Sequence, residues 1–492
     1  MKAVIGIDVG TSGCKVIALS ESGEILSSKL EEYPVYSPQI GWSEQDPEDW
    51  WQGTCKALKE LADELSDVEI VGVGLSGQMH GMCALDENSA VIRRAILWND
   101  QRTQKQCDEI TAAAGGIDGL LSYTNNQMLT GYTGGKILWM REHEPENFKK
   151  TQIILNPKDY IRYKLTGDCC TEVSDASGTG FFDTKNRCFS KELLKKLDLS
   201  ESLFPKCVES TDITGTVSAQ AQTETGIKAG TPVAGGGGDA VISTTGMGLI
   251  NTDRIGVTLG TSGVVAMGRD SFTPNKGGKI QAFCNNSSDS WHAMGVTLSA
   301  AGSYVWFRNT FGKYEIEQQK VTGINAYKQL DMLAEQTPAG ADGLVFTPYL
   351  TGERCPHNDP DARGCFSGIT SQHTLGHFAR AVLEGVAFSL KSVFDLMCED
   401  AKKDSKIVLA GGGAVSPLWR QIFADIWEIP VCTVYGSAEG GAFGAAIVAG
   451  AALKLWNYKE AADLIKEECT VLPNASNAEL YRAQYQKYLS LY

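Results

Sequence analysis

Runs of apolar and β-branched residues flank a repeated polar turn, Gly-Thr-Ser-Gly, once in each half of the chain. Residues 5–9 and 14–19 flank the first copy, and residues 255–259 and 264–267 flank the second. Each pattern predicts a β-hairpin with a flexible tip. The copies begin about 250 positions apart in a chain of 492 residues, so the pattern indicates one domain plan that is built twice.

Stretches of apolar residues at helical spacing follow short apolar runs that predict strands. One helix opens at Asp46, the expected N-cap, has Pro47 in its first turn and runs to about Leu65. Other helices are expected near Trp98, after Gly134, over 158–165, 298–311, 377–398 and 418–427, and from Gly440. Other strands are expected at 25–31, 71–77, 82–85, 92–97, 231–234, 291–296 and 406–410. Residues 171–180 predict a polar loop.

The two hairpin tips are candidate phosphate-binding sites, because such a turn presents backbone N–H groups and hydroxyls to an anion. A single tip of this kind is more often an ordinary turn, but two copies in the same strand context favour a pair that shares a phosphate chain. The residues concerned are Gly10, Thr11 and Ser12, and Gly260, Thr261 and Ser262. Asp8 beside the first tip is Thr258 beside the second. A carboxylate near phosphate requires a cation between them, so Asp8 predicts a magnesium-handling group.

Four consecutive glycines, Gly235–Gly238, separate a predicted strand from Asp239, which begins an apolar helix. Asp239 could serve only as the helix cap, which is common. A cap does not require the glycines, however, and glycines are costly in chain entropy but permit close approach of the backbone to a ligand. Asp239 is therefore the candidate catalytic base, which would accept the proton of a hydroxyl nucleophile.

A second strand, glycine run and helix surrounds Gly411, Gly412 and Gly413 but lacks the acid. We expect these glycines to pack against a flat base or ribose. A formal Gly-x-Gly-x-x-Gly at 72–77 is not followed at once by a helix, so a dinucleotide site is disfavoured. Its glycines are expected to let a strand end approach a ligand. His80 alone is as consistent with a structural role as with a ligand contact.

Trp98, Asn99 and Asp100 follow a predicted strand and combine an aromatic ring with hydrogen-bonding groups, as sugar sites do. The alternative is that Asp100 caps a helix and Trp98 belongs to the core. The residue types leave both interpretations open.

Composition and charge narrow the function classes. A chain of 492 residues exceeds one hydrophobic core, and we expect two domains, 1–247 and 248–492. The net charge of −15, without a block of Lys or Arg, disfavours binding to nucleic acid or an anionic membrane.

The 14 cysteines contain no Cys-x-x-Cys spacing, so neither a zinc cluster nor a disulfide framework is expected. The longest near-apolar run, 441–453, is too short to span a bilayer. A cytoplasmic location is expected.

Two longer motifs resemble the signatures of the FGGY family of carbohydrate kinases, and the likeness covers nearly the whole chain. The first is Gly131-x-Thr133-x-x-Lys136-Ile137-x-Trp139-Met140-x-Glu142-His143, and the second joins Gly364-x-Phe366-x-Gly368-Ile369 to the stretch 377–385. The resemblance implies an α/β fold of two actin/hexokinase-like (ribonuclease H-like) ATPase domains that flank a central cleft, with the sugar site in the first domain and the nucleotide site in the second.

Within that family, the stretches 42–47, 78–81, 97–102 and 349–357 look most like those of xylulokinases. This resemblance implies transfer of the ATP γ-phosphoryl group to a ketopentose, most simply the 5-hydroxyl of D-xylulose. It implies Asp239 as the catalytic base, a sugar site lined by Gln78, Met79 and His80, and Mg²⁺ and ATP positioned by Asp8. It also places Lys15, Gly302 and the glycines 411–413 at the nucleotide.

One residue departs from the xylulokinase pattern, because Ala240 stands where asparagine is usual after the catalytic aspartate. Kinases of L-xylulose, ribulose, gluconate or glycerol therefore remain alternatives, as does a non-kinase ATPase on the actin fold. The expected partners are a small sugar and ATP, and the sequence leaves a homodimer open.

Overall fold

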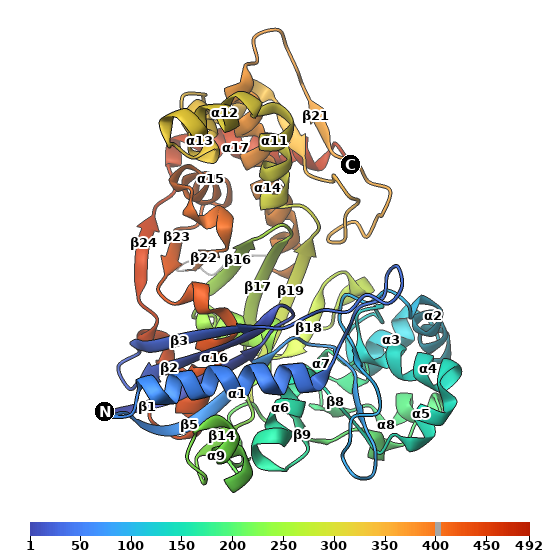
Figure 1. Ribbon diagram of the computed structural model, residues 1–492. Coiled ribbons are helices and arrows are strands. Elements are labelled where there is room, and N and C mark those ends of the chain that lie inside the picture. The colour runs from blue at the N-terminus through green and yellow to red at the C-terminus, as the bar shows by residue number, and fades with distance from the viewer. Residues whose placement is uncertain (399–404) are drawn as a thin grey trace. The chain divides into compact units, whose positions relative to one another are not determined.

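The computed structural model describes residues 1–398 and 405–492, which form two compact units (Figure 1). The first unit consists of Met1–Asn251, Gly268–His292 and Glu439–Ile465. The second consists of Thr252–Met267, Ala293–Ala438 and Lys466–Tyr492. Each unit therefore gathers three separate segments of the chain, whereas the division expected from the sequence is contiguous at 247/248 and stays a prediction.

A mixed sheet organises the first unit, in the strand order β13-β14-β5-β1-β2-β3, with β15 also paired to β5. Its strands are β1 (Lys2–Val9), β2 (Gly13–Ser20), β3 (Ile25–Glu32), β5 (Glu69–Gly77), β13 (Ile213–Thr216), β14 (Pro232–Ala234) and β15 (Gly237–Gly238). The first predicted hairpin is confirmed, because β1 and β2 pair antiparallel with Val9 opposite Cys14. β1 runs parallel to β5, so the ends of these two strands lie at the same edge of the sheet.

Helices α1 (Pro47–Glu64) and α16 (Gly440–Ala452) pack on opposite faces of this sheet. Alternate residues of a strand point to opposite sides of a sheet, so the contacts of β1 show which helix covers which face. Ile5, Ile7 and Val9 of β1 belong to the same buried cluster as Trp50 of α1. On the other face a Cβ added to Gly6 would lie only 1.9 Å from the carbonyl oxygen of Ala442 in α16. The predicted start of α1 is confirmed, since the side chain of Asp46 accepts a hydrogen bond from the Glu48 N–H at 3.0 Å.

Shorter elements complete the first unit. They are β4 (Glu44–Gln45), β6 (Cys83–Leu85), β7 (Ala95–Ile96), α2 (Gln104–Ala113), α3 (Ile117–Thr124), α4 (Thr133–His143), α5 (Pro145–Lys150), β8 (Ile153–Leu155), α6 (Pro157–Thr166), β9 (Cys170–Glu172), α7 (Val173–Ser177), β10 (Phe182–Asp183), β11 (Cys188–Phe189), α8 (Lys191–Lys196), β12 (Lys206–Val208), α9 (Ala219–Thr225), α10 (Asp239–Gly246) and β18 (Gln281–Cys284).

Two expectations for the first unit were wrong. Residues 171–180 do not form a loop throughout, because β9 and α7 occupy most of them; Glu172 caps α7 by accepting from the N–H groups of Ser174 and Asp175. The strand expected at 92–97 shortens to β7, and the helix expected near Trp98 begins only at Gln104. At 171–180 the cap by Glu172 starts a helix within the polar stretch, and at 92–97 only Ala95 and Ile96 pair with a partner strand, β4.

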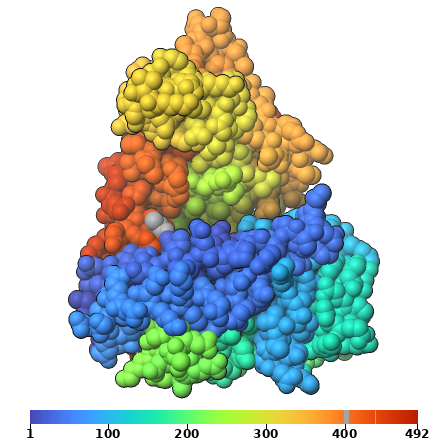
Figure 2. Space-filling model, in the orientation of Figure 1, coloured from blue at the N-terminus to red at the C-terminus, as the bar shows by residue number. Residues whose placement is uncertain are grey.

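The second unit repeats the hairpin with β16 (Arg254–Leu259) and β17 (Gly263–Arg269), where Leu259 pairs with Gly263, as predicted. Its sheet continues through the order β19-β17-β16-β22-β23-β24. The other elements are β19 (Trp291–Thr297), α11 (Ala301–Phe311), α12 (Lys313–Thr322), α13 (Ala326–Glu335), β20 (Val345–Thr347), β21 (Cys365–Ser367), α14 (Leu375–Met397), β22 (Lys406–Ala410), α15 (Pro417–Trp427), β23 (Val431–Val434), β24 (Glu467–Val471) and α17 (Ala478–Leu489). Helices α11–α13, drawn in yellow, lie at the surface of this unit (Figure 2).

In the part of the chain that the structure describes, no helix combines the length and apolar character needed to cross a membrane. All 14 cysteines carry free thiols, and Cys14, Cys83 and Cys107 are among the buried ones.

The contact between α16 and the sheet gives a first prediction. A Cβ on Gly74 of β5 would lie 2.0 Å from the carbonyl oxygen of Ala445, and this backbone atom cannot rotate away. We expect Gly74→Ala to lower the free energy of unfolding by about 1–3 kcal/mol, the usual cost of overpacking. Thermal unfolding followed by circular dichroism measures it. Gly412→Ala is the matched control, since nothing lies within 4 Å of its added Cβ; equal midpoints for both variants would contradict the close contact.

Candidate active site

The parallel register of β1 and β5 places Asp8 directly opposite Ser76. The Ser76 hydroxyl donates to Oδ1 of Asp8 at 2.6 Å. The first turn of α16 closes over this pair: a Cβ on Gly441 would lie 2.3 Å from Ser76 Oγ and 2.7 Å from Asp8 Oδ1. Burial raises the pKa of Asp8 above its ordinary value, against the opposing effects of the Ser76 hydrogen bond and the charge of Lys15.

Asp239 lies at the same edge of the sheet as Asp8, because β15, which precedes it, also pairs in parallel with β5. β15 pairs with β5 so that Gly237 lies opposite Ser76 and Gly238 opposite Gly77. Asp239 then begins α10, after Gly238 as the N-cap residue, so it does not itself cap the helix. The second carboxylate is thus placed at the end of a strand that neighbours the strand pair carrying Asp8.

The surroundings of Asp239 combine burial, a second carboxylate and backbone donors. Oδ1 accepts from the N–H of Ala240 at 2.7 Å and from the N–H of Met79 at 3.3 Å. Burial, followed by the negative charge of Asp8, raises the pKa of Asp239 to about 7, although the two backbone hydrogen bonds act in the opposite direction. A carboxyl group with a pKa near neutrality can accept a proton and release it again under ordinary conditions, which is the property that a general base needs.

Met79 and His80 follow β5 directly and lie beside Asp239. A Cβ on Gly238 would lie 2.5 Å from Met79 Cγ, so only a glycine lets this methionine pack against the segment that carries Asp239. His80 adopts a φ of 70° and stacks on Tyr132 with the ring centroids 4.6 Å apart. Nδ1 of His80 lies 2.6 Å from the carbonyl oxygen of Gly178.

The protonation state of His80 follows from these contacts. Burial, followed by the charge of Lys136, lowers the pKa of His80 to about 3, so the ring is neutral near pH 7. A carbonyl oxygen only accepts hydrogen bonds, which places the single ring proton on Nδ1. Nε2 of His80 is therefore an acceptor, and it suits a hydroxyl group that donates.

The other predicted sugar-site residues separate into two groups. Trp98 is 47% exposed, and its indole N–H donates to Thr11 Oγ1 at 2.9 Å. Asn99 is also exposed. In contrast, Asp100 is fully buried and forms an ion pair with Arg102 at 2.7 Å. Gln78 is fully buried as well, and its amide oxygen accepts from the hydroxyl of Thr11 at 3.1 Å.

Lys15 and the first tip lie together at the end of the first hairpin. The Gly10 N–H donates to the carbonyl oxygen of Gly13 at 3.0 Å, which closes the turn. The Lys15 ammonium lies 3.3 Å from a carboxylate oxygen of Glu439, directly before α16. The hydroxyl of Tyr33 donates to the carbonyl oxygen of Gly10 at 2.6 Å and so restrains the tip.

In the second unit, the residues predicted for the nucleotide form their own group. The N–H of Ala301 donates to the carbonyl oxygen of Gly260 at 2.9 Å, so α11 begins against the second tip. A Cβ on Gly302 would lie 2.7 Å from the carbonyl oxygen of Thr261. Ser262 completes this turn before β17 begins.

The glycines after β22 lie on the other side of β16. Thr258 pairs with Ala410 in parallel register, which brings Gly411 beside Leu259. Gly411 has a φ of 85°, and a Cβ there would lie 2.7 Å from the carbonyl oxygen of Leu259. Nothing lies within 4 Å of a Cβ placed on Gly412. Gly413 again packs tightly on Leu259, so the run combines two close contacts with one open position.

The chemistry of Asp8 fits a hard cation. Ser76 engages only one of its two carboxylate oxygens, Oδ1, in the hydrogen bond described above. Mg²⁺ keeps several water ligands and is usually held by one or two carboxylates together with substrate phosphates. Among the described residues no group of three or more His, Cys, Asp or Glu side chains is placed to hold a metal ion. Asp8 therefore fits a magnesium ion that arrives with a phosphate chain.

Sequence reasoning assigned no role to two buried residues that hold this site. The Lys136 ammonium donates to the carbonyl oxygens of His80 and Gly131, each at 2.6 Å. Its pKa falls to about 7, mainly because of burial. Ser174 of α7 accepts from the N–H of Gly238 at 3.0 Å. The spacing Thr133-x-x-Lys136 is a sequence signal for Lys136, because both side chains donate to the carbonyl oxygen of His80. No local signal indicates Ser174.

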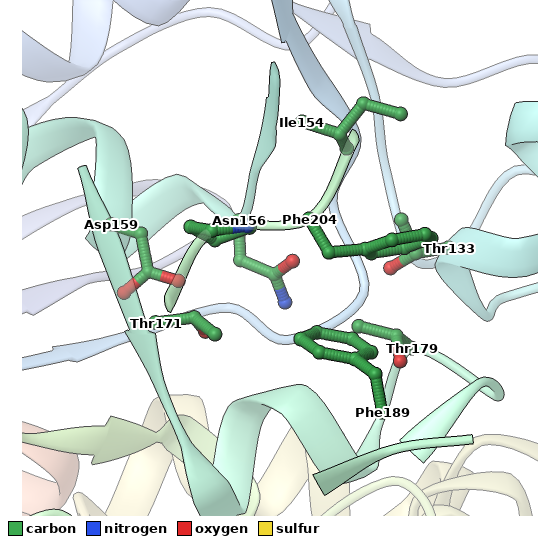
Figure 3. Close-up of a pocket in the computed structure, with 9 residues that line it drawn as sticks. Thr133, Ile154, Asn156, Asp159, Thr171, Thr179, Phe189 and Phe204 are labelled. Carbon is green, nitrogen blue, oxygen red and sulfur yellow. The ribbon is translucent and has the colours of Figure 1, made fainter. Parts of the chain in front are cut away.

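A small cavity lies elsewhere in the first unit, and Figure 3 shows the side chains of Asn156, Phe189 and Phe204 among those around it. It is lined by Thr133, Ile154, Asn156, Asp159, Thr171, Thr179, Phe189, Phe204 and Pro205. None of the residues predicted for the sugar or for phosphate lines it. The cavity is therefore separate from the two carboxylates.

Comparison with known proteins agrees with this geometry. Residues 3–246 match the N-terminal domain, and residues 256–453 the C-terminal domain, of the FGGY family of carbohydrate kinases. A xylulose kinase of Bacillus subtilis is 38% identical over 497 residues, covering 100% of this chain and 97% of the relative. A gluconokinase of the same organism is 31% identical, covering 99% of this chain and 95% of the relative.

A solved structure described as a xyloylose kinase from Brucella ovis superimposes with a TM-score of 0.90 at 33% identity, covering 100% of this chain and 98% of that one. This likeness bears out the expected pair of actin/hexokinase-like domains. The two family matches together span most of the sequence, and the relatives cover it from end to end. This chain belongs to the FGGY family of carbohydrate kinases, phosphotransferases that act on an alcohol group.

Proposed function

We propose that this chain transfers the γ-phosphoryl group of ATP to the 5-hydroxyl group of D-xylulose, with Asp239 as the catalytic base. The observation that carries the proposal is the position of Asp239, whose raised pKa and backbone donors suit it to receive a proton beside a second carboxylate. The similarity to xylulose kinases over the full length supports the choice of sugar. The assignment of residues 1–247 to the sugar half and 248–492 to the nucleotide half belongs to this proposal.

In the proposed reaction the 5-oxygen of the sugar forms a bond to the γ-phosphorus while the bond from phosphorus to the ADP oxygen breaks. Asp239 accepts the hydroxyl proton, and Nε2 of His80 orients the sugar by accepting from another hydroxyl group. Phosphoryl transfer depends mainly on positioning and on neutralising charge, so most of the catalytic effect would come from holding the reactants in line. Mg²⁺, with Asp8 as its carboxylate ligand, would supply positive charge at the phosphates.

The two glycine-rich tips would hold the phosphate chain through backbone N–H groups, with Lys15 near the first tip. Gly302 and the segment Gly411–Gly413 would contact the nucleotide, for which the open position at Gly412 is suited. Trp98 and Asn99 are exposed and available to the sugar. Gln78 and Asp100 are fully buried, so they would hold neighbouring residues in position and not contact the sugar directly. A cytoplasmic location and a homodimer complete the proposal.

A kinase of gluconate is the second candidate, because a gluconokinase is also similar over nearly the whole chain. Ala240 beside the base adds support, since it offers no side-chain amide to the reacting end of the sugar.

A substrate panel distinguishes the candidates. We expect ADP release to be fastest with D-xylulose when it is compared with L-xylulose, ribulose, gluconate and glycerol in a coupled assay. A site built to hydrogen-bond a substrate hydroxyl rejects an analogue that lacks it by about 10⁴- to 10⁵-fold. A faster rate with gluconate would replace the first candidate by the second, and ADP release that ignores every sugar would contradict both.

Replacing Asp239 tests its role in the chemistry. We expect Asp239→Asn to lower kcat by about 10²- to 10⁴-fold, the usual contribution of a general base, while KM for the sugar changes little. Steady-state kinetics with saturating ATP measure both constants. Asp108→Asn, at an aspartate on the surface helix α2 that accepts from Gln104, is the matched control and should retain full activity. Near-normal turnover of Asp239→Asn would remove Asp239 from the mechanism.

The pH dependence of the rate follows from the same group. Asp239 must be ionised to accept a proton, and its pKa in the folded enzyme is about 7. Below that pH we expect kcat/KM for the sugar to fall about tenfold per pH unit, and above it to level off. An ordinary aspartate would give a profile that stays flat down to about pH 4. A flat profile between pH 5 and 8 would therefore contradict the assignment.

A further inference from the structure

Gln45, in β4, is a fully buried amide that uses both of its polar atoms inside the first unit. Its Nε2 donates to the carbonyl oxygen of Thr11 at 2.7 Å and to that of Pro34 at 3.2 Å. Its Oε1 accepts from the indole N–H of Trp50 at 2.9 Å and from Nε2 of Gln78 at 2.7 Å. A buried amide with all of these partners fixes their relative positions, because losing any one of them leaves an unsatisfied polar group.

Trp50 fixes which end of the Gln45 amide is the donor and which is the acceptor. An indole N–H can only donate, so the atom of Gln45 that faces it must be the oxygen. Gln78 must then present its amide nitrogen to Gln45, which leaves its oxygen to accept from the hydroxyl of Thr11 at 3.1 Å. The only hydroxyl proton of Thr11 is used in this bond, and its oxygen accepts from Trp98 at 2.9 Å. Thr11 is therefore oriented by its neighbours before any ligand binds.

The network joins the two sides of the proposed reaction. Thr11 lies in the first tip, which is proposed to hold phosphate. Gln78 directly precedes Met79, whose N–H donates to Asp239. The backbone N–H of Gln78 also donates to the carbonyl oxygen of Val9, two residues before Thr11, at 2.9 Å. A displacement of the tip would therefore be transmitted to the segment that contacts the base.

We infer that Gln45 is a positioning residue that couples the phosphate-side tip, residues 10–13, to the sugar-side segment, residues 78–80. Through Gln45 and Gln78, order in one segment favours order in the other, so binding of the sugar strengthens binding of the triphosphate. The inference deepens the proposed function and rests on it for the identity of the two ligands. Coupled sites typically change each other's affinity by about 5- to 150-fold, and the change is reciprocal.

Hydrogen–deuterium exchange of the ligand-free protein tests the structural part without any assumption about the substrate. The variants are Gln45→Met, which keeps the side-chain length, and Gln45→Glu, which keeps the acceptor but removes the donor toward Thr11. We expect exchange in residues 10–13 and 78–80 to become about tenfold faster in both variants, because each leaves a buried polar group unsatisfied. Gln106→Met, at an equally buried glutamine that donates to Glu142, is the control and should leave both segments unchanged.

Isothermal titration tests the functional part. The dissociation constant of a nonhydrolysable ATP analogue with Mg²⁺ is measured without and with D-xylulose. The ratio of the two dissociation constants is the coupling between the sites. We expect a ratio above about fivefold for the native protein and the Gln106→Met control, and a ratio near one for both Gln45 variants. A general loss of folding would lower the affinity for each ligand alone, whereas loss of coupling changes only the ratio.

The outcomes separate the two proposals. If both Gln45 variants keep the native ratio, or if faster exchange is confined to one segment, Gln45 does not couple the sites. If the native protein binds no D-xylulose at all, the proposed sugar is wrong, and the exchange experiment still decides whether the two segments are joined. Should Gln45→Met fail to fold, Gln45→Glu carries the same comparison with an isosteric side chain.

Discussion

Two carboxylates at the ends of neighbouring strands are the constraint on which the rest of the first unit depends. Parallel pairing of β1 with β5, and of β15 with β5, fixes the positions of Asp8 and Asp239 at the same edge of the sheet. Bringing two acids together in a partly buried place is unfavourable while both are ionised. The site compensates with the Ser76 hydroxyl at Asp8 and with two backbone N–H groups at Asp239.

Glycines make this arrangement sterically possible. Gly441 lets the first turn of α16 approach Asp8 and Ser76, and Gly238 leaves room for Met79 beside Asp239. Gly236, with a φ of 75°, would place a Cβ 2.0 Å from the carbonyl oxygen of Leu75. Larger residues would separate the strand ends from the helices that cover them. The conformational entropy lost by ordering these glycines is therefore a cost of placing Asp8 and Asp239 at these positions.

The local pattern was sufficient to predict the hairpins and the helix that starts at Asp239, because a strand, a glycine turn and a helix start are all encoded by adjacent residues. It failed at 171–180, where α7 depends on the cap that Glu172 provides, and at 92–97, where only Ala95–Ile96 is paired. The role of Gln45 could not be predicted, because its partners Thr11 and Gln78 are each more than thirty residues away. The burial of Asp100 and its ion pair with Arg102 likewise follow from packing that no short window contains.

The proposed mechanism requires the folded protein to raise the affinity of Asp239 for a proton, so that Asp239 can serve as a base near neutral pH. A direct measurement is the pH titration of its carboxyl band by infrared difference spectroscopy, native protein minus Asp239→Asn. We expect a midpoint at about pH 7, in agreement with the raised pKa of Asp239. A midpoint near 4, the ordinary value for an aspartate, would contradict it.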